Sequence, residues 1–316
     1  MKKKSLLIAL ILIISISLLG CTSQTNKEDS SAPLQPLTIG VMPDLDSIPF
    51  IIAEHNGYFK EEGIDVTIEH FKSAMDRDTA LQTKKLDGAI SDMLAVVFFN
   101  DNDFDVKITS KTDGSFKLIA GKDSGISSID QVDGKSIGIS KNTIIEYLTD
   151  RIMEISNIDV NSPEKVAIPK IPTRLEMLNN GKLDMATLPE PLASLAVTAG
   201  GSILNSSDKL GVNPGIMLFT SDAIDSKPKE IQALYRAYNK AVTFLKEEKM
   251  ESYIDFVIEE AGFPKNIKDT LTLPDYTKAS MPSEKELEEV LTWLKSKDLT
   301  SNDYTLKELS TDEFVK

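Results

Sequence analysis

LTIGV at residues 37–41 is followed by a close copy, SIGI, at residues 136–139, and this pair indicates the architecture of the chain. A second pair, KLDGA at 85–89 and KLDMA at 182–186, lies 97 positions apart, against 98 for Thr38 and its copy. Each copy begins an apolar run short enough to be a buried strand. Two matches at nearly one offset indicate an internal repeat, so the sequence predicts two similar halves.

Within the first half, short β-rich runs alternate with amphipathic segments. Strands are predicted at 37–41, 64–69 and 88–90, with helices at 50–58 and 76–84 between them. Strands that alternate with helices along a chain pair in parallel and are covered by those helices. The predicted fold class is therefore α/β.

The chain continues beyond the second copy of the repeat. A long helix with an apolar face from Ile231 to Leu245 is predicted, followed by a last helix that begins at a capping box on Ser283. These helices need a core, and the economical solution returns them to the first half through two crossings, near 122–127 and 218–222. The predicted domains are 37–121 plus 222–316 for the first lobe and 122–221 for the second.

The amino terminus resembles a bacterial lipoprotein signal. Three lysines precede an apolar run from Leu6 to Leu19, which ends in Leu-Leu-Gly-Cys at Cys21, the only cysteine. Fourteen helical residues span about 21 Å, less than a hydrocarbon core of roughly 30 Å. The resemblance implies a cleaved signal at 1–20, acyl chains on Cys21 and a polar tether at 21–36; alternatively, Cys21 only ends an ordinary signal peptide.

Composition excludes several classes of protein. The 316 residues hold 49 acidic against 35 basic side chains, a net charge of −14, which argues against nucleic acid as a partner. One cysteine forms no intrachain disulfide, and two separated histidines give no metal-ligand spacing. His55 and His70 have no nucleophile pattern beside them, and no catalytic motif is found. We expect a monomer without metal or cofactor.

Candidate binding residues follow the predicted strands. In open parallel sheets, ligands bind outside the carboxyl ends of the strands. This rule selects four loops, with these candidates: Asp44, Asp46, Ser47 and Phe50; Ser91 and Asp92; Ser140, Asn142 and Thr143; Pro189 and Glu190. Each polar one could instead cap a helix or face water. Glu190, held between two prolines, is the preferred ligand contact, and Phe50 is a candidate for stacking on a ring.

The phrase GYFKEEGI at residues 57–64 carries a family resemblance. Together with KLDGA at 85–89, VDGKSIG at 132–138 and LPEPLA at 188–193, it resembles the extracytoplasmic solute-binding proteins of the sulfonate, nitrate and thiamine-pyrimidine-precursor group. The resemblance implies a type II periplasmic-binding-protein fold, two α/β lobes joined by two hinge crossings. It also implies a small-molecule ligand, delivered to the permease of an ABC importer by a protein lipid-anchored outside the cell membrane.

The charges of the candidate loops bear on the ligand. They hold four acids, Asp44, Asp46, Asp92 and Glu190, against one base, Lys141. An uncompensated carboxylate beside a bound anion is costly, so an amine-bearing or pyrimidine-like solute is favoured over a sulfonate or nitrate. Two other functions stay open: an enzyme like the pyrimidine-precursor synthases, and a lipoprotein sensor without a transporter.

Overall fold

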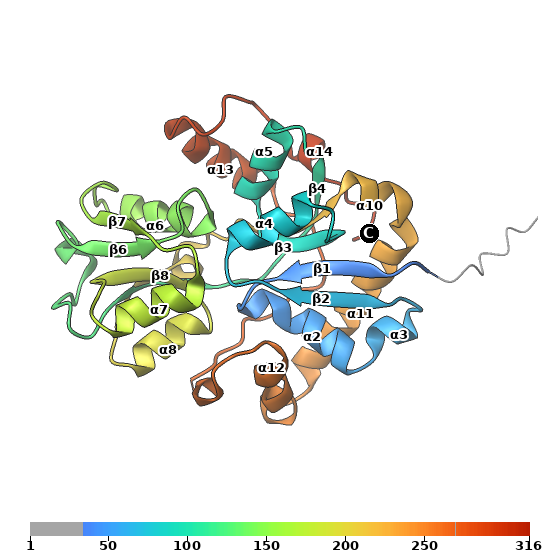
Figure 1. Cartoon of the computed structure of the whole chain (residues 1–316), viewed down its shortest axis with the longest axis horizontal. Helices are drawn as coiled ribbons and strands as arrows, with labels where there is room; N and C mark the ends of the chain where they lie inside the picture. The colour runs from blue at the N-terminus through green and yellow to red at the C-terminus, as the bar shows by residue number, and fades with distance from the viewer. Residues whose placement is uncertain (1–33, 269) are drawn as a thin grey trace, which may run out of the picture. The chain divides into compact units, whose positions relative to one another are not determined.

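A computed structural model describes residues 34–268 and 270–316 (Figure 1). The predicted signal at 1–20, Cys21 and all but the last three residues of the tether lie outside these ranges. In the part of the chain that is described, no helix combines the length and apolar character needed to cross a membrane.

The first of two five-stranded sheets holds the first copy of the repeat. Its strands, in spatial order, are β2 (Val66–His70), β1 (Leu37–Val41), β3 (Gly88–Asp92), β10 (Gly215–Thr220) and β4 (Val106–Lys111). β1 pairs in parallel with β2 and β3, whereas β10 runs antiparallel to β3 and β4. The strands predicted near 37–41, 64–69 and 88–90 are thus confirmed as neighbours.

The second sheet has the same order and directions. Its strands are β7 (Glu164–Ala167), β6 (Ser136–Ile139), β8 (Met185–Pro189), β5 (Phe116–Ala120) and β9 (Ser202–Ser206). β6 pairs in parallel with β7 and β8, and β5 is antiparallel to β8 and β9. The α/β fold class is therefore confirmed, with two mixed sheets of matching topology.

The repeat extends to individual hydrogen bonds. The Oδ2 atom of Asp87 accepts from the backbone N–H of Thr38 at 2.8 Å. The Oδ2 atom of Asp184 accepts from the backbone N–H of Ser136, also at 2.8 Å. The aspartate of each KLD phrase therefore fixes the start of the strand that lies beside it.

The chain passes between the sheets at points that differ from the predicted ones. It leaves the first sheet after Lys111 and enters the second at Phe116, and it returns between Ser206 and Gly215. Both crossings precede the predicted positions, 122–127 and 218–222, so β5 and β10 each belong to the sheet that the sequence did not assign. β10 is buried along its whole length and β5 is buried except at Lys117, and such a mostly apolar run fits the centre of either sheet equally well.

Helices cover both sheets. Those of the first half are α2 (Ile48–His55), α3 (Tyr58–Glu61), α4 (Ala74–Gln82), α5 (Met93–Asp101), α10 (Ser221–Ser226), α11 (Pro228–Glu247), α12 (Ile254–Glu260), α13 (Glu284–Ser296) and α14 (Leu306–Leu309). Those of the second half are α6 (Ile144–Ile155), α7 (Ile171–Asn179), α8 (Leu192–Thr198) and α9 (Ser207–Leu210). Figure 1 shows α6 above the second sheet in the view and α7 and α8 below it.

The two C-terminal helices return to the first half, as predicted. α11 packs on α2 and α3, and α13 packs on α5. The capping box at the start of α13 is present, with the Ser283 hydroxyl accepting from the backbone N–H of Glu286 and the Glu286 carboxylate accepting from that of Ser283. Burial of their apolar faces against the first half is what ties the end of the chain to its beginning.

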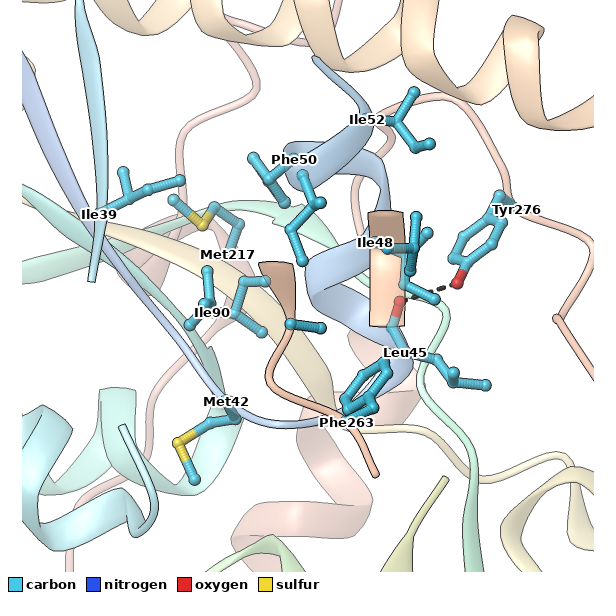
Figure 2. Packing of buried hydrophobic residues seen from close by; sticks show 14 of the residues in the cluster. Ile39, Met42, Leu45, Ile48, Phe50, Ile52, Ile90, Met217, Phe263 and Tyr276 are labelled. Carbon is cyan, nitrogen blue, oxygen red and sulfur yellow. Dashed lines mark hydrogen bonds between the residues drawn. The ribbon is translucent and has the colours of Figure 1, made fainter. Parts of the chain in front are cut away.

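The core beside the end of β1 fixes the first candidate loop. Figure 2 shows Met42, Leu45 and Ile48 among buried side chains drawn from several elements, including Met217 of β10. The hydroxyl of Tyr276 donates to the backbone oxygen of Leu45 at 2.8 Å (Figure 2). Apolar packing and this bond together hold the loop that carries Asp44 and Asp46.

Candidate functional site

A cavity of about 40 Å³ lies where the carboxyl ends of the parallel strands of the two sheets meet. Both halves line it, with residues Met42, Asp44, Asp46, Ala74, Arg77, Ile90, Ser91, Asp92, Phe116, Ser140, Thr143, Ile144, Ile145, Pro169, Ile171, Arg174, Pro189 and Gly215. Since one water needs roughly 10–15 Å³ by this measure, the cavity holds about three water-sized groups.

Direct backbone contacts join the halves beside this cavity. The N–H of Leu45 donates to the oxygen of Glu190 at 3.1 Å, and the N–H of Ile171 donates to the oxygen of Lys72 at 3.0 Å. Both bonds run from a loop of one sheet to a loop of the other. They hold the two halves together near the cavity, so the loops would have to separate before a larger molecule could bind between them.

Asp44 and Asp46 stand on the 3₁₀ turn that follows β1. Both are buried, and the Oδ1 atom of each has no hydrogen-bond partner among the described residues. Asp46 packs directly on Gly114, where an added Cβ would lie 2.4 Å from Oδ2. A glycine is therefore required at position 114 for Asp46 to stay where it is.

Burial dominates the acidity of these carboxyls. It raises the pKa of Asp44 to about 7, although the Arg77 guanidinium and two backbone N–H groups oppose the shift. Burial also raises the pKa of Asp46 well above its usual value, with repulsion from Asp44 and Asp113 acting in the same direction and the Thr112 hydroxyl and the backbone N–H of Asp113 opposing it. Because each charge disfavours the other, the pair holds less than its full negative charge near neutral pH.

Arg77 of α4 brings a positive charge to the same cavity. Its Nη1 donates to the backbone oxygen of Ile90 at 3.1 Å, and its Nε donates to Oδ1 of Asp78 at 2.8 Å. Burial alone would lower the pKa of Arg77, but Asp78, Asp92 and Asp44 raise it above its usual value. The Arg77 charge is thus balanced within the protein.

Arg174 of α7 brings a second positive charge, and this one is not balanced. The side chain is fully buried, and its Nη1 donates to the backbone oxygen of Ile168 at 2.9 Å. Its Nε and Nη2 have no hydrogen-bond partner in the described part of the chain, and no carboxylate there forms a salt bridge with it. Burial lowers the pKa of Arg174 to about 9.

The predicted loop residues divide into two groups. Seven line the cavity: Asp44, Asp46, Ser91, Asp92, Ser140, Thr143 and Pro189. Two of these also cap helices, since Asp92 accepts from the N–H of Ala95 and Thr143 accepts from that of Ile145. The hydroxyl of Ser91 is buried without a partner among the described residues. The structure therefore brings together side chains from all four predicted loops.

Four candidates do not line the cavity. Ser47 donates to the backbone oxygen of Asp44, and Phe50 packs in the core with its ring 5.1 Å from that of Tyr238. Asn142 has a left-handed backbone, with φ of 56°, and its N–H donates to Glu146. The Glu190 carboxylate is occupied by the ammonium of Lys117 and by the N–H and hydroxyl of Ser194.

Sequence reasoning missed both arginines and counted a lysine that lies elsewhere. Lys141 lines a separate surface pocket with Asn142 and Glu146, not the cavity between the sheets. Arginine is rarely fully buried, so neither residue was selected as a candidate from its place in a predicted helix or beyond one. The repeat offered the missing signal, because Arg77 and Arg174 are separated by the same 97 positions as the two KLD phrases.

The two histidines lie away from this cavity. The ring of His55 stacks on that of Phe256 at a centroid distance of 3.5 Å, and burial lowers the pKa of His70. Within residues 34–268 and 270–316, no group of three or more His, Cys, Asp or Glu side chains could hold a metal ion. What the cavity offers is a set of charged and hydrogen-bonding groups around a small space, which suits the binding of a small polar molecule.

Comparisons with known proteins agree with this arrangement. A sequence model of the family described as NMT1/THI5 like matches residues 44–252. A Bacillus subtilis (strain 168) protein named for the binding of aliphatic sulfonates is 24% identical over 262 residues, 78% of this chain and 75% of that protein.

Solved structures share the fold. The alkanesulfonate-binding protein SsuA from Xanthomonas axonopodis pv. citri, bound to MOPS, superposes with a TM-score of 0.77 at 15% identity, over 89% of this chain and 99% of that one. The periplasmic nitrate-binding protein NrtA from Synechocystis PCC 6803 superposes with a TM-score of 0.72 at 12% identity, over 89% and 87%. The type II periplasmic-binding-protein fold is confirmed by these likenesses.

Proposed function

Because the chain belongs to the NMT1/THI5-like family, we propose that it is the substrate-binding protein of an ABC importer. In this proposal, the protein captures a small organic solute between its two sheets and delivers it to the permease. The observation that carries the proposal is the cavity itself, which is lined from both halves by buried polar groups that lack partners among the described residues. The binding-protein names of the curated relatives support the same role.

Two lobes that move are part of the proposal. A ligand that touches both halves stabilises only the form in which they are close together, so binding shifts the population toward that form. The strand order and the packing of α9 support lobes made of residues 34–111 plus 215–316 and of residues 116–210, with hinges in the connections between them. The permease would then distinguish the loaded from the empty protein by its shape.

The protein would act outside the cell membrane. The lipoprotein-like sequence at Cys21 supports a diacylglycerol anchor, with residues 21–36 as the tether. Replacing Cys21 with serine in the full chain should move the protein from the membrane fraction to the soluble fraction of the expressing bacterium. Retention of the Cys21→Ser variant in the membrane would contradict the anchor.

The ligand that the cavity favours carries an amine. Glu190 and Lys141 do not line the cavity. Arg77 is paired with Asp78, and Arg174 is the positive charge of the lining that remains unpaired in the described part of the chain. Asp44 and Asp46 keep carboxylate oxygens free for N–H donors. An amine-bearing solute can donate hydrogen bonds to these oxygens, whereas nitrate or a simple sulfonate has no hydrogen-bond donor.

Binding and transport need separate tests. A thermal-shift and calorimetric screen of amines, aminopyrimidines, sulfonates and nitrate should find a ligand that raises the melting temperature, because a ligand that binds only the folded state stabilises it. Uptake of that ligand into vesicles holding the permease and ATPase should then require the protein. Binding without uptake would favour a sensor, and recovery of a chemically altered ligand would favour an enzyme.

A further inference from the structure

The two buried arginines occupy equivalent places in the repeat. Arg77 is the fourth residue of α4 and Arg174 the fourth of α7; Nη1 of Arg77 donates to the backbone oxygen of Ile90 within β3, and Nη1 of Arg174 donates to that of Ile168 just after β7. Each also packs beside a strand glycine: an added Cβ would lie 3.5 Å from Cγ of Arg77 at Gly40 and 3.1 Å from Cγ of Arg174 at Gly138. The two side chains are therefore built into the sheets in the same manner.

Their remaining nitrogens differ. Nε of Arg77 donates to Oδ1 of Asp78 at 2.8 Å, and Nη2 forms an ion pair with the same oxygen at 2.7 Å without making a hydrogen bond, so this edge of the guanidinium lies against a carboxylate. The residue that follows Arg174 is Leu175, which offers no such oxygen. The same edge of Arg174 is buried and has no partner among the described residues.

A buried guanidinium without an anion is costly, because the low-dielectric surroundings replace the water that would solvate it. Two adjacent N–H groups on one edge match the two oxygens of a carboxylate or sulfonate. The first half meets this need with its own Asp78, whereas the second half leaves it open at the wall of the cavity. The missing partner is therefore an oxyanion that comes from the ligand.

The acidic groups on the other wall of the cavity favour a positively charged part of the ligand. Oδ1 of Asp44, Oδ1 of Asp46 and the Ser91 hydroxyl are buried there without partners in the described part of the chain. The charged groups that face them are Arg77, Asp92 and Asp113, of which only Arg77 is positive. An ammonium group would both donate to these oxygens and restore the charge balance.

We propose that the cavity selects a short zwitterion, whose oxyanion lies on the Nε and Nη2 edge of Arg174 and whose ammonium group lies against Asp44 and Asp46. The inference rests on the proposed binding function and names the ligand class for it. Because the cavity of about 40 Å³ holds only about three water-sized groups, the loops must part to admit such a ligand, and a short chain between the two charged ends needs the least opening.

The first experiment separates the two charges of the ligand. Calorimetry on the full chain uses β-alanine and taurine as zwitterions, propionate and ethanesulfonate as anions alone, and propylamine as the cation alone. At least one zwitterion should bind ten times more tightly than each of its single-charge counterparts. Equal affinity for a single-charge probe, or no binding of either zwitterion, would overturn the proposal. The carboxylate and sulfonate arms also decide which oxyanion is preferred.

The second experiment gives Arg174 an internal anion. Leu175→Asp places a carboxylate next to Arg174, as Asp78 lies next to Arg77, and should weaken binding of the preferred zwitterion at least a hundredfold; because Leu175 is buried, circular dichroism must first show that the variant is folded. Leu175→Asn is the matched control, with the same shape and no charge, and should bind within threefold of wild type. Normal binding by a folded Leu175→Asp variant would contradict the proposal.

A third variant makes the test independent of position 175. Arg174→Lys keeps the positive charge but cannot present two N–H groups along one edge. The Arg174→Lys variant should bind the zwitterion at least ten times more weakly than wild type and should bind propylamine with unchanged affinity. A loss that is equal for both probes would mean that Arg174 only supports the fold. If an aminopyrimidine or a simple sulfonate binds the wild-type protein tightly and no zwitterion does, the proposed ligand class is wrong but the proposed binding function stands.

Discussion

At the scale of single residues, the cavity is defined by groups whose hydrogen-bonding capacity is left unused. Buried polar atoms in folded proteins nearly always have partners, and an orphaned one costs about 1–3 kcal/mol. Asp44, Asp46, Ser91 and Arg174 all carry such atoms around one space. The ligand-free protein therefore gives up stability that a matching ligand returns.

The pH dependence of stability tests this cost at Asp44. Its pKa is about 7 in the folded protein against 3.8 for an unperturbed group, so ionising it opposes folding as the pH rises from about 4 to 7. Asp44→Asn removes this penalty. The variant should be more stable than wild type at pH 8, by up to about 4 kcal/mol at roughly 1.4 kcal/mol per pKa unit. The difference should vanish near pH 4.

Urea unfolding of the ligand-free protein at both pH values measures the effect. Asp65→Asn is a suitable control, because Asp65 is exposed and its charge remains in water. A difference between Asp44→Asn and wild type that stays constant with pH would show that Asp44 is not strained by burial.

Glu190 was the preferred ligand contact in the sequence, and its surroundings now favour a structural role. Its carboxylate is shared between Lys117 and Ser194 and does not line the cavity. Glu190→Ala should lower the free energy of unfolding by about 2 kcal/mol, since it leaves those donors unpaired. Glu190→Gln keeps the contact with Ser194 and should cost less. Tenfold weaker ligand binding without a change in stability would restore Glu190 to the site.

At the scale of elements, the repeat determines how closely side chains pack on the strands. Gly40 of β1 and Gly138 of β6 make room for the leucine of each KLD phrase: a Cβ would be 2.7 Å from Cδ1 of Leu86 in one case and 2.6 Å from Cδ1 of Leu183 in the other. Gly→Ala at either site overpacks a buried contact, which typically costs 1–3 kcal/mol.

The two glycines should nevertheless differ in their effect on binding. Gly138→Ala moves Arg174, which has nothing else to hold its free edge, whereas Gly40→Ala presses on an arginine already fixed by Asp78. We expect the two variants to lose similar stability and Gly138→Ala to lose at least five times more ligand affinity. Thermal denaturation and calorimetry on the pair measure both quantities, and equal losses of affinity would argue against a special role of Arg174.

The individual helices and strands were the features that the sequence predicted best. The periodicity of 37–90 and the capping box at Ser283 are local, so they could be read without the fold. The sheet to which β5 and β10 belong depends on long-range pairing, which a short apolar run does not encode. The arginines were missed for a related reason, because burial of a charged residue is a property of the assembled halves.

At the scale of the molecule, an ionic cluster far along α6 connects the halves. Asp150 of α6 is fully buried and accepts from Nε1 of Trp293 in α13 at 3.0 Å. Nζ of Lys297, which follows α13, lies 2.7 Å from the same oxygen, Oδ2 of Asp150. Nζ of Lys165 lies 2.5 Å from Oδ1 of Asp150. Because α13 packs on α5 and α6 packs on β8, any separation of the two halves at this point must break the bonds of Asp150 to α13.

Trp293→Phe tests whether this cluster sets the balance between open and closed forms. The substitution keeps an aromatic ring against Tyr147 and removes one donor to a buried carboxylate, a bond of about 1.5–3 kcal/mol. If only the closed form binds, apparent affinity falls with the closed fraction, so binding should weaken about tenfold or more. Small-angle scattering of the ligand-free variant should show a larger radius of gyration than wild type. Thr292→Ala, a change on the exposed side of α13, is the control, and unchanged scattering and affinity in Trp293→Phe would mean that Asp150 stabilises α6 without restraining the halves.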